Sequence, residues 1–307
     1  MNKRNPFAIG AFKVAAGTRA TLNLPVSVLS DHTPVTMSVH VIHGDKPGPV
    51  LFVSAAIHGD EVIGVEIVRR VLQSKNIKNI AGTLIAIPIV NTFGFMNHSR
   101  YLPDRRDLNR SFPGSQSGSL AGRLAHLFET EIVARSDYGI DLHSAAIHRT
   151  NLPQIRVSPN NENTMDLANA FGAPLVLKSK LRDGSLRSMA RKYGIDILLY
   201  EAGEGLRFDE FAVRVGVSGC MRVMQKLGMI TGRGLPKSKI KPIQSTHSAW
   251  ERAPAGGLLR CFKAAGETVS VGDVMGIIAD PFGDFEEPVV AAHSGLIIGR
   301  TNLPIVN

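Results

Sequence analysis

The stretch PVLFVSAAIHGDEVIGVEIVRRVLQS, residues 49–74, contains the transition that decides the fold. The apolar run over 49–57 is typical of a buried strand, and residues 61–74 repeat their apolar positions with the period of a helix. His58 and Glu61 lie at the junction between the strand-like run and the helix-like run. Because the carboxyl ends of strands border the crevice where open α/β sheets bind ligands, this pair is a candidate half of a metal site.

His143 is the predicted third ligand. It ends the run YGIDLH, residues 138–143, which follows a helical pattern and is typical of another strand end. Two imidazoles and one carboxylate are a common ligand set for hydrolytic zinc, and the fourth position is left to water. Of the ten histidines, His43, His98 and His148 are the main rivals, but none pairs as clearly with a carboxylate at a strand end. His148 could instead line a substrate pocket.

Strand-like and helix-like runs alternate from Pro49 to about Ile230. This alternation predicts an α/β fold, with a mixed, mostly parallel sheet and helices on both faces. Two earlier runs, 22–30 and 35–44, predict an opening hairpin or sheet edge. The predicted strands are 51–57, 83–90, 138–143, 154–158, 173–179 and 196–203, and the predicted helices are 61–74, 119–136, 162–172, 185–194 and 215–230.

A stretch rich in Gly, Pro and Lys, residues 231–247, indicates a domain boundary. We predict a catalytic domain over residues 1–240 and a small all-β appendage over 241–307, where short apolar runs alternate with turn signals. The appendage resembles a barrel-sandwich domain of the biotinyl or lipoyl type. Its hairpin tip, residues 281–285, is PFGDF and offers no lysine for a cofactor, which favours a structural or lid role.

The segment SRYLPDRRDLNRSFPG, residues 99–114, adds polar residues between the two halves of the metal site. In chain order, the polar residues of these motifs are His58, Glu61, Arg100, Asp107, Asn109, Arg110, His143 and Glu201. In this order, over roughly residues 40–230, the chain resembles the succinylglutamate desuccinylase and aspartoacylase family of zinc carboxypeptidase-like hydrolases. Several separate motifs in one order are much more specific than any single motif.

The resemblance implies a role for each group of residues. It implies one zinc ion per chain, bound by His58, Glu61 and His143. It implies that Glu201 is the general base and that Arg100 stabilises the negative charge that develops on the carbonyl oxygen. These residue types suit amide hydrolysis, because zinc lowers the pKa of a bound water to about 7 and makes hydroxide available near neutrality.

Asn109 and Arg110 are implied to bind the carboxylate of the substrate, for which the planar guanidinium group is well suited. The partner of the second ring nitrogen of His58 is implied to be Asp107. Some alternatives stay open on the residues alone. They are Arg105 or Arg106 in place of Arg100, Glu204 in place of Glu201, and Asp141 in place of Asp107.

The leading interpretation is a zinc-dependent hydrolase that cleaves the amide bond of an N-acyl amino acid, a small-molecule substrate. A metallocarboxypeptidase acting on short peptides would use the same residues, and a metal-binding relative without catalysis would retain only the scaffold. The sequence does not identify the acyl group or the amino acid. Four arginines, Arg149, Arg156, Arg182 and Arg187, could meet an acidic acyl chain or face water.

Composition restricts the remaining functional classes. The 307 residues are 44% apolar, and none of their apolar runs is long enough to cross a bilayer or forms a convincing signal peptide. With only two cysteines, the chain fits a reducing compartment, and we expect a cytoplasmic protein. The net charge of +9 comes from scattered basic residues, so neither nucleic acid nor membrane is expected as a partner. An exposed edge in the appendage could support a homo-oligomer.

Overall fold

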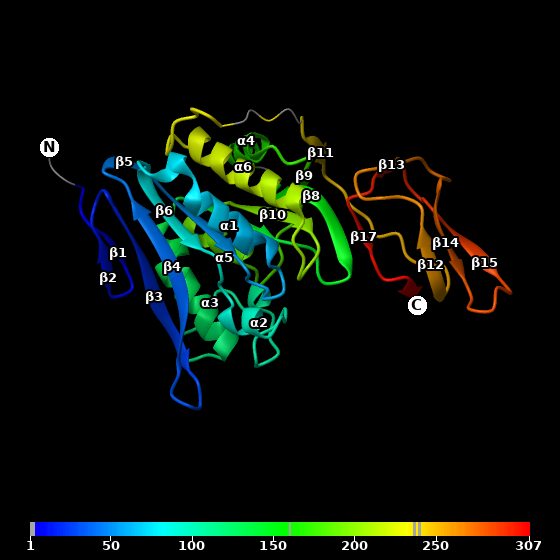
Figure 1. The fold of residues 1–307 in the computed structure, drawn as a ribbon, viewed down its shortest axis with the longest axis horizontal. Coiled ribbons are helices and arrows are strands. Elements are labelled where there is room, and N and C mark those ends of the chain that lie inside the picture. Colours follow the sequence, from blue (N-terminus) through cyan, green and yellow to red (C-terminus); the bar gives the residue numbers. More distant parts are fainter. Residues whose placement is uncertain (1–3, 160, 236–237, 239–240) are drawn as a thin grey trace.

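The computed structural model describes residues 4–159, 161–235, 238 and 241–307 (Figure 1). A large α/β unit, called the body below, contains strands β1 (Phe7–Ile9), β2 (Phe12–Val14), β3 (Thr18–Val28), β4 (Pro34–His43), β5 (Lys46–Ala55), β6 (Ala81–Ile87), β7 (Tyr138–His143), β8 (Arg149–Val157), β9 (Leu175–Lys178), β10 (Ile197–Gly203), β11 (Ile243–Ser245) and β17 (Gly299–Thr301). Its α-helices are α1 (Ile63–Gln73), α2 (Thr92–Met96), α3 (Leu120–Glu131), α4 (Glu162–Phe171), α5 (Leu186–Ala190) and α6 (Glu210–Lys226). Its short 3-10 helices are η1 (Lys75–Ile77), η2 (Leu108–Arg110), η3 (Val133–Arg135) and η4 (Arg191–Tyr193).

The centre of the body is a single sheet to which ten strands of the described residues belong. Its order is β11-β9-β8-β10-β7-β5-β6-β4-β3, with β17 paired to β8. Pairing is parallel from β10 through β7 and β5 to β6, and also from β8 through β9 to β11. Antiparallel pairing joins β8 to β10 and joins the opening hairpin, β3 and β4, to β6. The predicted mixed, mostly parallel sheet and its opening hairpin are therefore confirmed.

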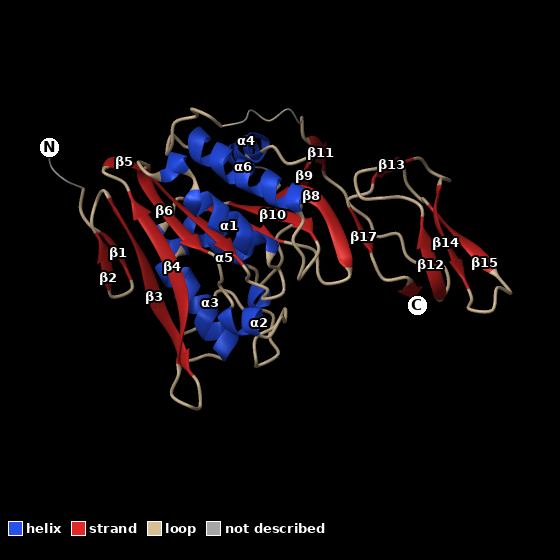
Figure 2. Cartoon of the chain, viewed as in Figure 1, coloured by secondary structure: helices blue, strands red, loops and turns tan. Residues whose placement is uncertain are grey.

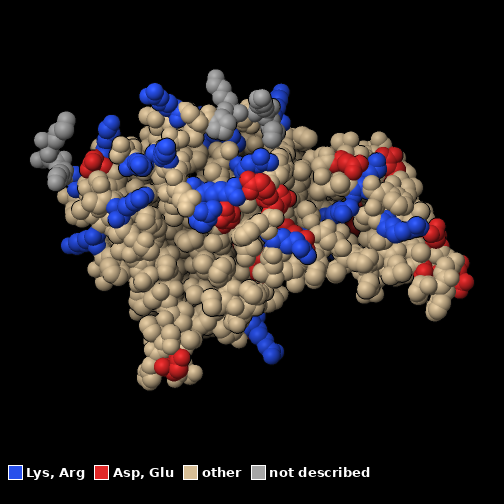
Figure 3. All heavy atoms as spheres, viewed as in Figure 1, with Lys and Arg blue, Asp and Glu red and all other residues tan. Residues whose placement is uncertain are grey.

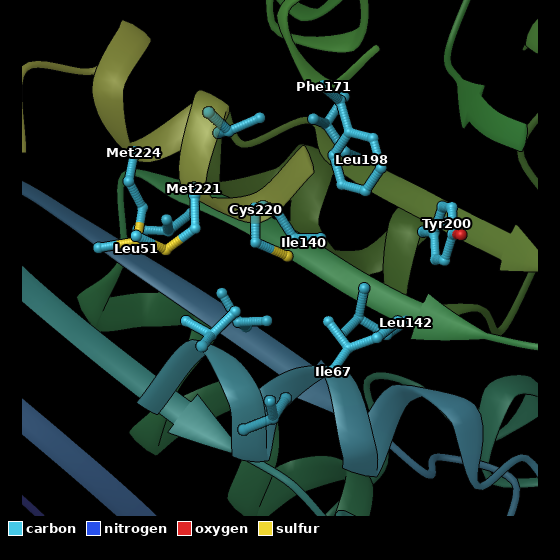
Figure 4. Close-up of a cluster of buried hydrophobic side chains, with 14 of the residues drawn as sticks. Leu51, Ile67, Ile140, Leu142, Phe171, Leu198, Tyr200, Cys220, Met221 and Met224 are labelled. Carbon is cyan, nitrogen blue, oxygen red and sulfur yellow. The ribbon is translucent and has the colours of Figure 1, made fainter. Parts of the chain in front are cut away.

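Helices cover both faces of this sheet (Figure 2). One face packs against α1, α4 and α6, and Figure 4 shows Ile67 of α1 and Met221 of α6 in one buried apolar cluster with Leu51 of β5 and Ile140 of β7. The other face packs against α3 and α5, where Phe128 lies edge-on to Phe52 of β5. The amphipathic periods of the helices thus place one apolar side of each helix on the sheet.

Most element boundaries differ from the sequence prediction by a few residues, and for two of them the structure shows the cause. Helix α6 begins at Glu210 instead of Val215, because the Asp209 side chain caps it by accepting a hydrogen bond from the N–H of Ala212. Strand β8 begins at Arg149 and not at residue 154, because its first residues pair with β17 from the far end of the chain. A local pattern cannot reveal such a distant partner.

The strands beyond the body are called the appendage and are β12 (Gly257–Cys261), β13 (Thr268–Val269), β14 (Val274–Ala279), β15 (Glu286–Val290), β16 (Gly295–Leu296) and β18 (Ile305–Val306). Within the described residues, β15, β14, β12 and β18 form an antiparallel sheet, and β13 pairs with β16. The appendage lies to one side of the body (Figure 1).

The division at residues 240 and 241 stays a prediction. Residues 236, 237, 239 and 240 lie outside the described part of the chain. Two strands from beyond this point, β11 and β17, pair with β9 and β8 and so join the main sheet. None of the helices formed by the described residues has the length and apolar character needed to cross a membrane.

Candidate metal centre and active site

The turn after β5 carries His58 to the carboxyl edge of the sheet. Ala56, directly after this strand, has a φ of 51°, a conformation that is uncommon for residues with a side chain and often occurs at functional sites. Gly59 follows the histidine, and a β-carbon there would lie 1.9 Å from the carbonyl carbon of Gly94. The turn therefore packs directly on the backbone of α2, and this close contact restricts its backbone conformation.

Helix α1 approaches the same edge because Gly64 has no side chain. A β-carbon at this position would lie 2.7 Å from the β-carbon of Ala55 and 2.8 Å from that of Leu142. These two residues pair across β5 and β7. The close packing brings Glu61, just before α1, against His143 at the end of β7.

The structure brings the three predicted ligands together. His58 Nδ1 lies 2.6 Å from Glu61 Oε1, and His143 Nδ1 lies 2.7 Å from Glu61 Oε2. One ligand atom from each of the three residues falls within 4.8 Å of the others, and all three side chains are buried. Both histidines therefore direct the same ring nitrogen, Nδ1, toward a shared centre.

Carboxylates bind the outer nitrogens of both histidines. Asp107 Oδ1 lies 3.2 Å from His58 Nε2, and Asp141 Oδ2 lies 2.7 Å from His143 Nε2. The hydroxyl of Ser54 donates a hydrogen bond to the other oxygen of Asp141. The sequence left Asp107 and Asp141 as alternatives, whereas the structure uses one for each histidine. In a neutral histidine this contact keeps the proton on Nε2 and leaves the Nδ1 lone pair for a cation.

The close contacts between buried histidines and carboxylates shift the pKa values of these groups. Burial alone would lower the pKa of His143, but Asp141 and Glu61 raise it well above its usual value. Burial likewise opposes the charged form of His58, yet Glu61 and Asp107 raise its pKa. Burial would raise the pKa of Glu61, and the two histidines instead hold it far below its usual range. Protons and a cation therefore compete for the same two nitrogens.

The donor set fits a divalent cation that prefers nitrogen and oxygen ligands in a tetrahedral arrangement. Two neutral imidazoles and one carboxylate are a common set in hydrolytic zinc sites, and such sites keep the fourth position open. Here the ligand atoms already converge, and carboxylates fix both rings from outside. The residues present therefore fit zinc, and Glu61 is held ionised as a metal ligand must be.

Arg100 contacts this centre, and its two rivals do not. Its guanidinium donates to Glu61 Oε1 at 3.2 Å and to Asp107 Oδ2 at 3.0 Å. The side chains of Arg105 and Arg106 are exposed instead. Of the three arginines considered from the sequence, Arg100 is the one whose charge lies beside the predicted ligands.

Asn109 and Arg110 lie in η2, directly after Asp107. The Asp107 carboxylate accepts the backbone N–H of Asn109 and so fixes the start of this turn. Asn109 is buried, and its side-chain oxygen accepts the backbone N–H of Leu186. Arg110 is exposed and donates to the carbonyl oxygen of Asn109. The pair is therefore held beside the centre with one anchored amide and one guanidinium open to solvent.

Glu201 lies in β10 next to His143 of β7, and the two residues are paired in register. Residues paired in register share a face of the sheet, so the Glu201 side chain lies on the same face as His143. Its rival Glu204 is occupied elsewhere, since it accepts the backbone N–H of His148 and a hydrogen bond from Asn302. The register thus brings Glu201, and not Glu204, beside a predicted ligand.

The rival histidines are separate from the centre. His43 is buried and contacts Thr83 and the carbonyl oxygen of Asn5, while His98 and His148 are exposed. On the face drawn in Figure 3, basic side chains are spread over the surface, and acidic side chains lie beside some of them.

Sequence reasoning missed Asn151 and Gln154 beside Glu201, and it named Arg156 only as a possible contact of an acidic acyl chain. The Asn151 side chain donates to Glu201 Oε2 at 2.7 Å, and Arg156 Nη2 lies 3.5 Å from the same oxygen. Gln154, which pairs with Glu201 across β8 and β10, is fully buried. Among the described residues, neither atom of its amide has a hydrogen-bond partner. Gln154 and Arg156 share a face by alternation along β8, whereas Asn151 reaches Glu201 across a register shift between β8 and β10 that the sequence does not reveal.

A family comparison matches the central part of the chain. The model of the succinylglutamate desuccinylase/aspartoacylase catalytic domain covers residues 47–227. The N-alpha-acetyl-L-2,4-diaminobutyric acid deacetylase of Halomonas elongata is 25% identical over 291 residues, which are 91% of this chain and 85% of that relative.

Solved structures share the fold over almost the whole chain. A succinylglutamate desuccinylase/aspartoacylase from Rhodobacter sphaeroides superposes with a TM-score of 0.82 at 24% identity, covering 94% of this chain and 92% of its own. The product-bound ectoine utilization protein EutE (DoeB) from Ruegeria pomeroyi superposes with a TM-score of 0.84 at 22% identity, covering 99% and 96%. At identities of 24% and 22%, these comparisons establish a shared fold and nothing further about function.

Proposed function

Because the chain belongs to the succinylglutamate desuccinylase/aspartoacylase family, we propose that it is a zinc-dependent hydrolase that cleaves the amide bond of an N-acyl amino acid. One observation carries the proposal: ligand atoms of His58, Glu61 and His143 converge within 4.8 Å in a buried cluster. The relative from Halomonas elongata, named as a deacetylase of an N-acetylated amino acid, supports this class of substrate.

Zinc would be held by His58, Glu61 and His143. When bound, the ion supplies a Lewis acid that makes water a nucleophile near neutral pH and polarises the amide carbonyl. The carboxylates of Asp107 and Asp141 keep both histidine rings in the orientation that presents Nδ1. The protein thus provides a fixed, buried donor set that a flexible loop could not maintain.

Glu201 acts as the general base, because it lies on the same sheet face as His143 and its side chain is 18% exposed. It accepts a proton from the attacking water and delivers it to the leaving amine. Arg100 stabilises the negative charge that develops on the carbonyl oxygen, because its guanidinium is fixed beside Glu61 by Asp107.

Asn109 and Arg110 bind the carboxylate of the amino acid. The exposed guanidinium of Arg110 can form two parallel hydrogen bonds to a carboxylate, and its neighbour Asn109 is anchored to the backbone of α5. Binding at this point orients the amide of the substrate toward the centre and so raises the effective concentration of the reacting groups.

The proposal is tested by hydrolysis assays on metal-free and zinc-reconstituted protein. The substrates are acetyl and succinyl derivatives of neutral, acidic and basic amino acids, with dipeptides as a comparison set. We expect zinc-dependent release of free amine from at least one acylated amino acid and almost none from the Glu201→Gln variant. Turnover of dipeptides alone would identify a carboxypeptidase instead, and zinc binding without hydrolysis would identify a non-catalytic relative.

The predicted cytoplasmic location, the absence of nucleic-acid and membrane partners, and a homo-oligomeric state stay predictions. Cell fractionation and light scattering on the purified protein would examine the first and the last of these directly.

A further inference from the structure

We propose that strand β17 holds the carboxylate of Glu201 in position through Asn151, an inference that rests on the function proposed above. Asn151 lies in β8 between two glycines of neighbouring strands. Gly203 of β10 pairs with it on one side, and Gly299 of β17 pairs with it on the other. The side chain of Asn151 spans from β8 to Glu201 and donates the 2.7 Å hydrogen bond to Oε2.

The contacts on Glu201 are asymmetric. Asn151 and Arg156 both approach the same oxygen, Oε2, at 2.7 Å and 3.5 Å. No group in the described part of the chain donates a hydrogen bond to the other oxygen, Oε1. A carboxylate held through one oxygen presents the lone pairs of the other in a fixed direction, as proton transfer from a water requires. Asn151 is therefore a positioning residue that acts through Glu201.

Gly299 makes this arrangement possible. A β-carbon at Gly299 would lie 2.6 Å from Oδ1 of Asn151 and 3.2 Å from the carbonyl oxygen of Thr150. The easiest accommodation is for the flexible amide of Asn151 to swing away, and that movement breaks its contact with Glu201. A single methyl group added to β17 should therefore change the geometry of the base.

The segment around β17 is attached on both sides of this contact. Before it, the carbonyl oxygen of Ile298 accepts the backbone N–H of Leu152. After it, the Asn302 side chain donates to Thr150 Oγ1 at 2.7 Å and to Glu204 Oε2 at 3.0 Å. These bonds fasten β17 to the body on both sides of Gly299 and so keep Gly299 against Asn151.

The experiment compares variants of the full zinc-loaded chain. The variants are Asn151→Ala, Gly299→Ala and the double variant, and Gly295→Ala of the appendage strand β16 is the matched control because a β-carbon there meets no atom within 4 Å. The readouts are kcat and KM for the best acylated amino acid, bound zinc and the melting temperature. We expect Asn151→Ala to lower kcat about tenfold or more, with KM and zinc content unchanged.

Gly299→Ala should lower kcat in the same direction, and it should add nothing in the Asn151→Ala background, because its effect passes through that amide. Gly295→Ala should behave as the unaltered protein. The inference is overturned if Asn151→Ala keeps kcat within about twofold, or if Gly299→Ala lowers kcat by the same factor with and without Asn151.

A crystal structure of Gly299→Ala provides a readout that does not depend on activity. We expect the distance from Asn151 Nδ2 to Glu201 Oε2 to exceed 3.5 Å, and an unchanged contact would overturn the inference. If the unaltered protein hydrolysed no amide at all, the proposed function would fail, and this distance would still decide whether β17 holds the carboxylate.

Discussion

The body and the appendage differ in what they bury. The body has an apolar core on each face of its sheet, and between them it buries the charged side chains of Glu61 and Asp141. Among the described residues of the appendage, only Gly276, Ile278 and Ala291 are buried. Burying charged side chains requires a surrounding core that pairs them and excludes water, and the proposed catalytic groups lie in the region that has such a core. Because so few of its residues are buried, we expect the appendage to contribute little stability of its own.

The largest effect expected from this difference is on the metal. His143→Ala removes one of the three proposed zinc ligands, and we expect loss of stoichiometric zinc and a fall in kcat/KM of about 10³-fold or more. The matched control is His293→Ala, whose side chain in the appendage is 76% exposed. Zinc content measured by mass spectrometry and hydrolysis rates would check both. If His293→Ala lost as much zinc and activity as His143→Ala, the body and the appendage would not differ in their importance for metal binding.

The next effect concerns stability. Phe128 of α3 is fully buried between the rings of Phe52 and Phe112, whereas Phe262 beside the appendage strand β12 is 53% exposed. Phe128→Ala should lower the free energy of unfolding by about 3–5 kcal/mol, because it leaves a cavity in the core. Phe262→Ala should change it by about 0.5 kcal/mol or less. Urea denaturation measures both, and a large effect at Phe262 would show that the appendage has a substantial core after all.

A smaller effect is expected one step away from the metal. Asp141→Asn replaces the carboxylate that binds Nε2 of His143, and it should weaken zinc binding about 10- to 100-fold. Asp273→Asn changes an appendage aspartate that accepts a backbone N–H from Ser270 and serves as the control. Competition with a zinc chelator gives both affinities. Unchanged affinity in Asp141→Asn would mean that the ring of His143 is oriented by other contacts.

The smallest expected difference is in thiol reactivity, and it leaves the protein intact. Burial raises the pKa of the Cys220 thiol in α6 to about 12, while Cys261 in the appendage is exposed. At about pH 8 we expect a disulfide reagent to label Cys261 quickly and Cys220 only after unfolding. Mass spectrometry of the labelled peptides would locate the modified residue. Rapid labelling of Cys220 in the native protein would show that the body opens more easily than its core suggests.

Much of the fold and the convergence of the predicted ligands could be inferred from local patterns. The run of residues 49–74 contains a complete strand-to-helix transition, and the ligand residues stand at its centre and at the end of a second strand. Parallel strands end at one edge of a sheet, so His58 and His143 were expected to meet, and the structure brings them together. The periodicity of apolar residues and the parallel direction of the strands were sufficient to predict this convergence.

The rest depended on contacts that the sequence does not encode locally. Arg100 could not be separated from Arg105 and Arg106, because the course of this loop is set by the Asp107 carboxylate, which contacts Arg100 and caps η2. Asn151 was missed because its strand is extended by pairing with β17, far along the chain. In both cases a tertiary partner decides which of several similar residues reaches the centre.

The late position of β17 has a consequence during protein synthesis. At a translation rate of roughly 5–20 residues per second, roughly 5–20 seconds pass between the emergence of β10 and that of β17 from the ribosome. In that interval the nascent polypeptide already contains His58, Glu61, His143 and Glu201, but Gly299 has not yet been added. On the proposed function, a chain cut short before β17 should therefore contain the proposed zinc ligands and the proposed base but lack the strand that positions that base.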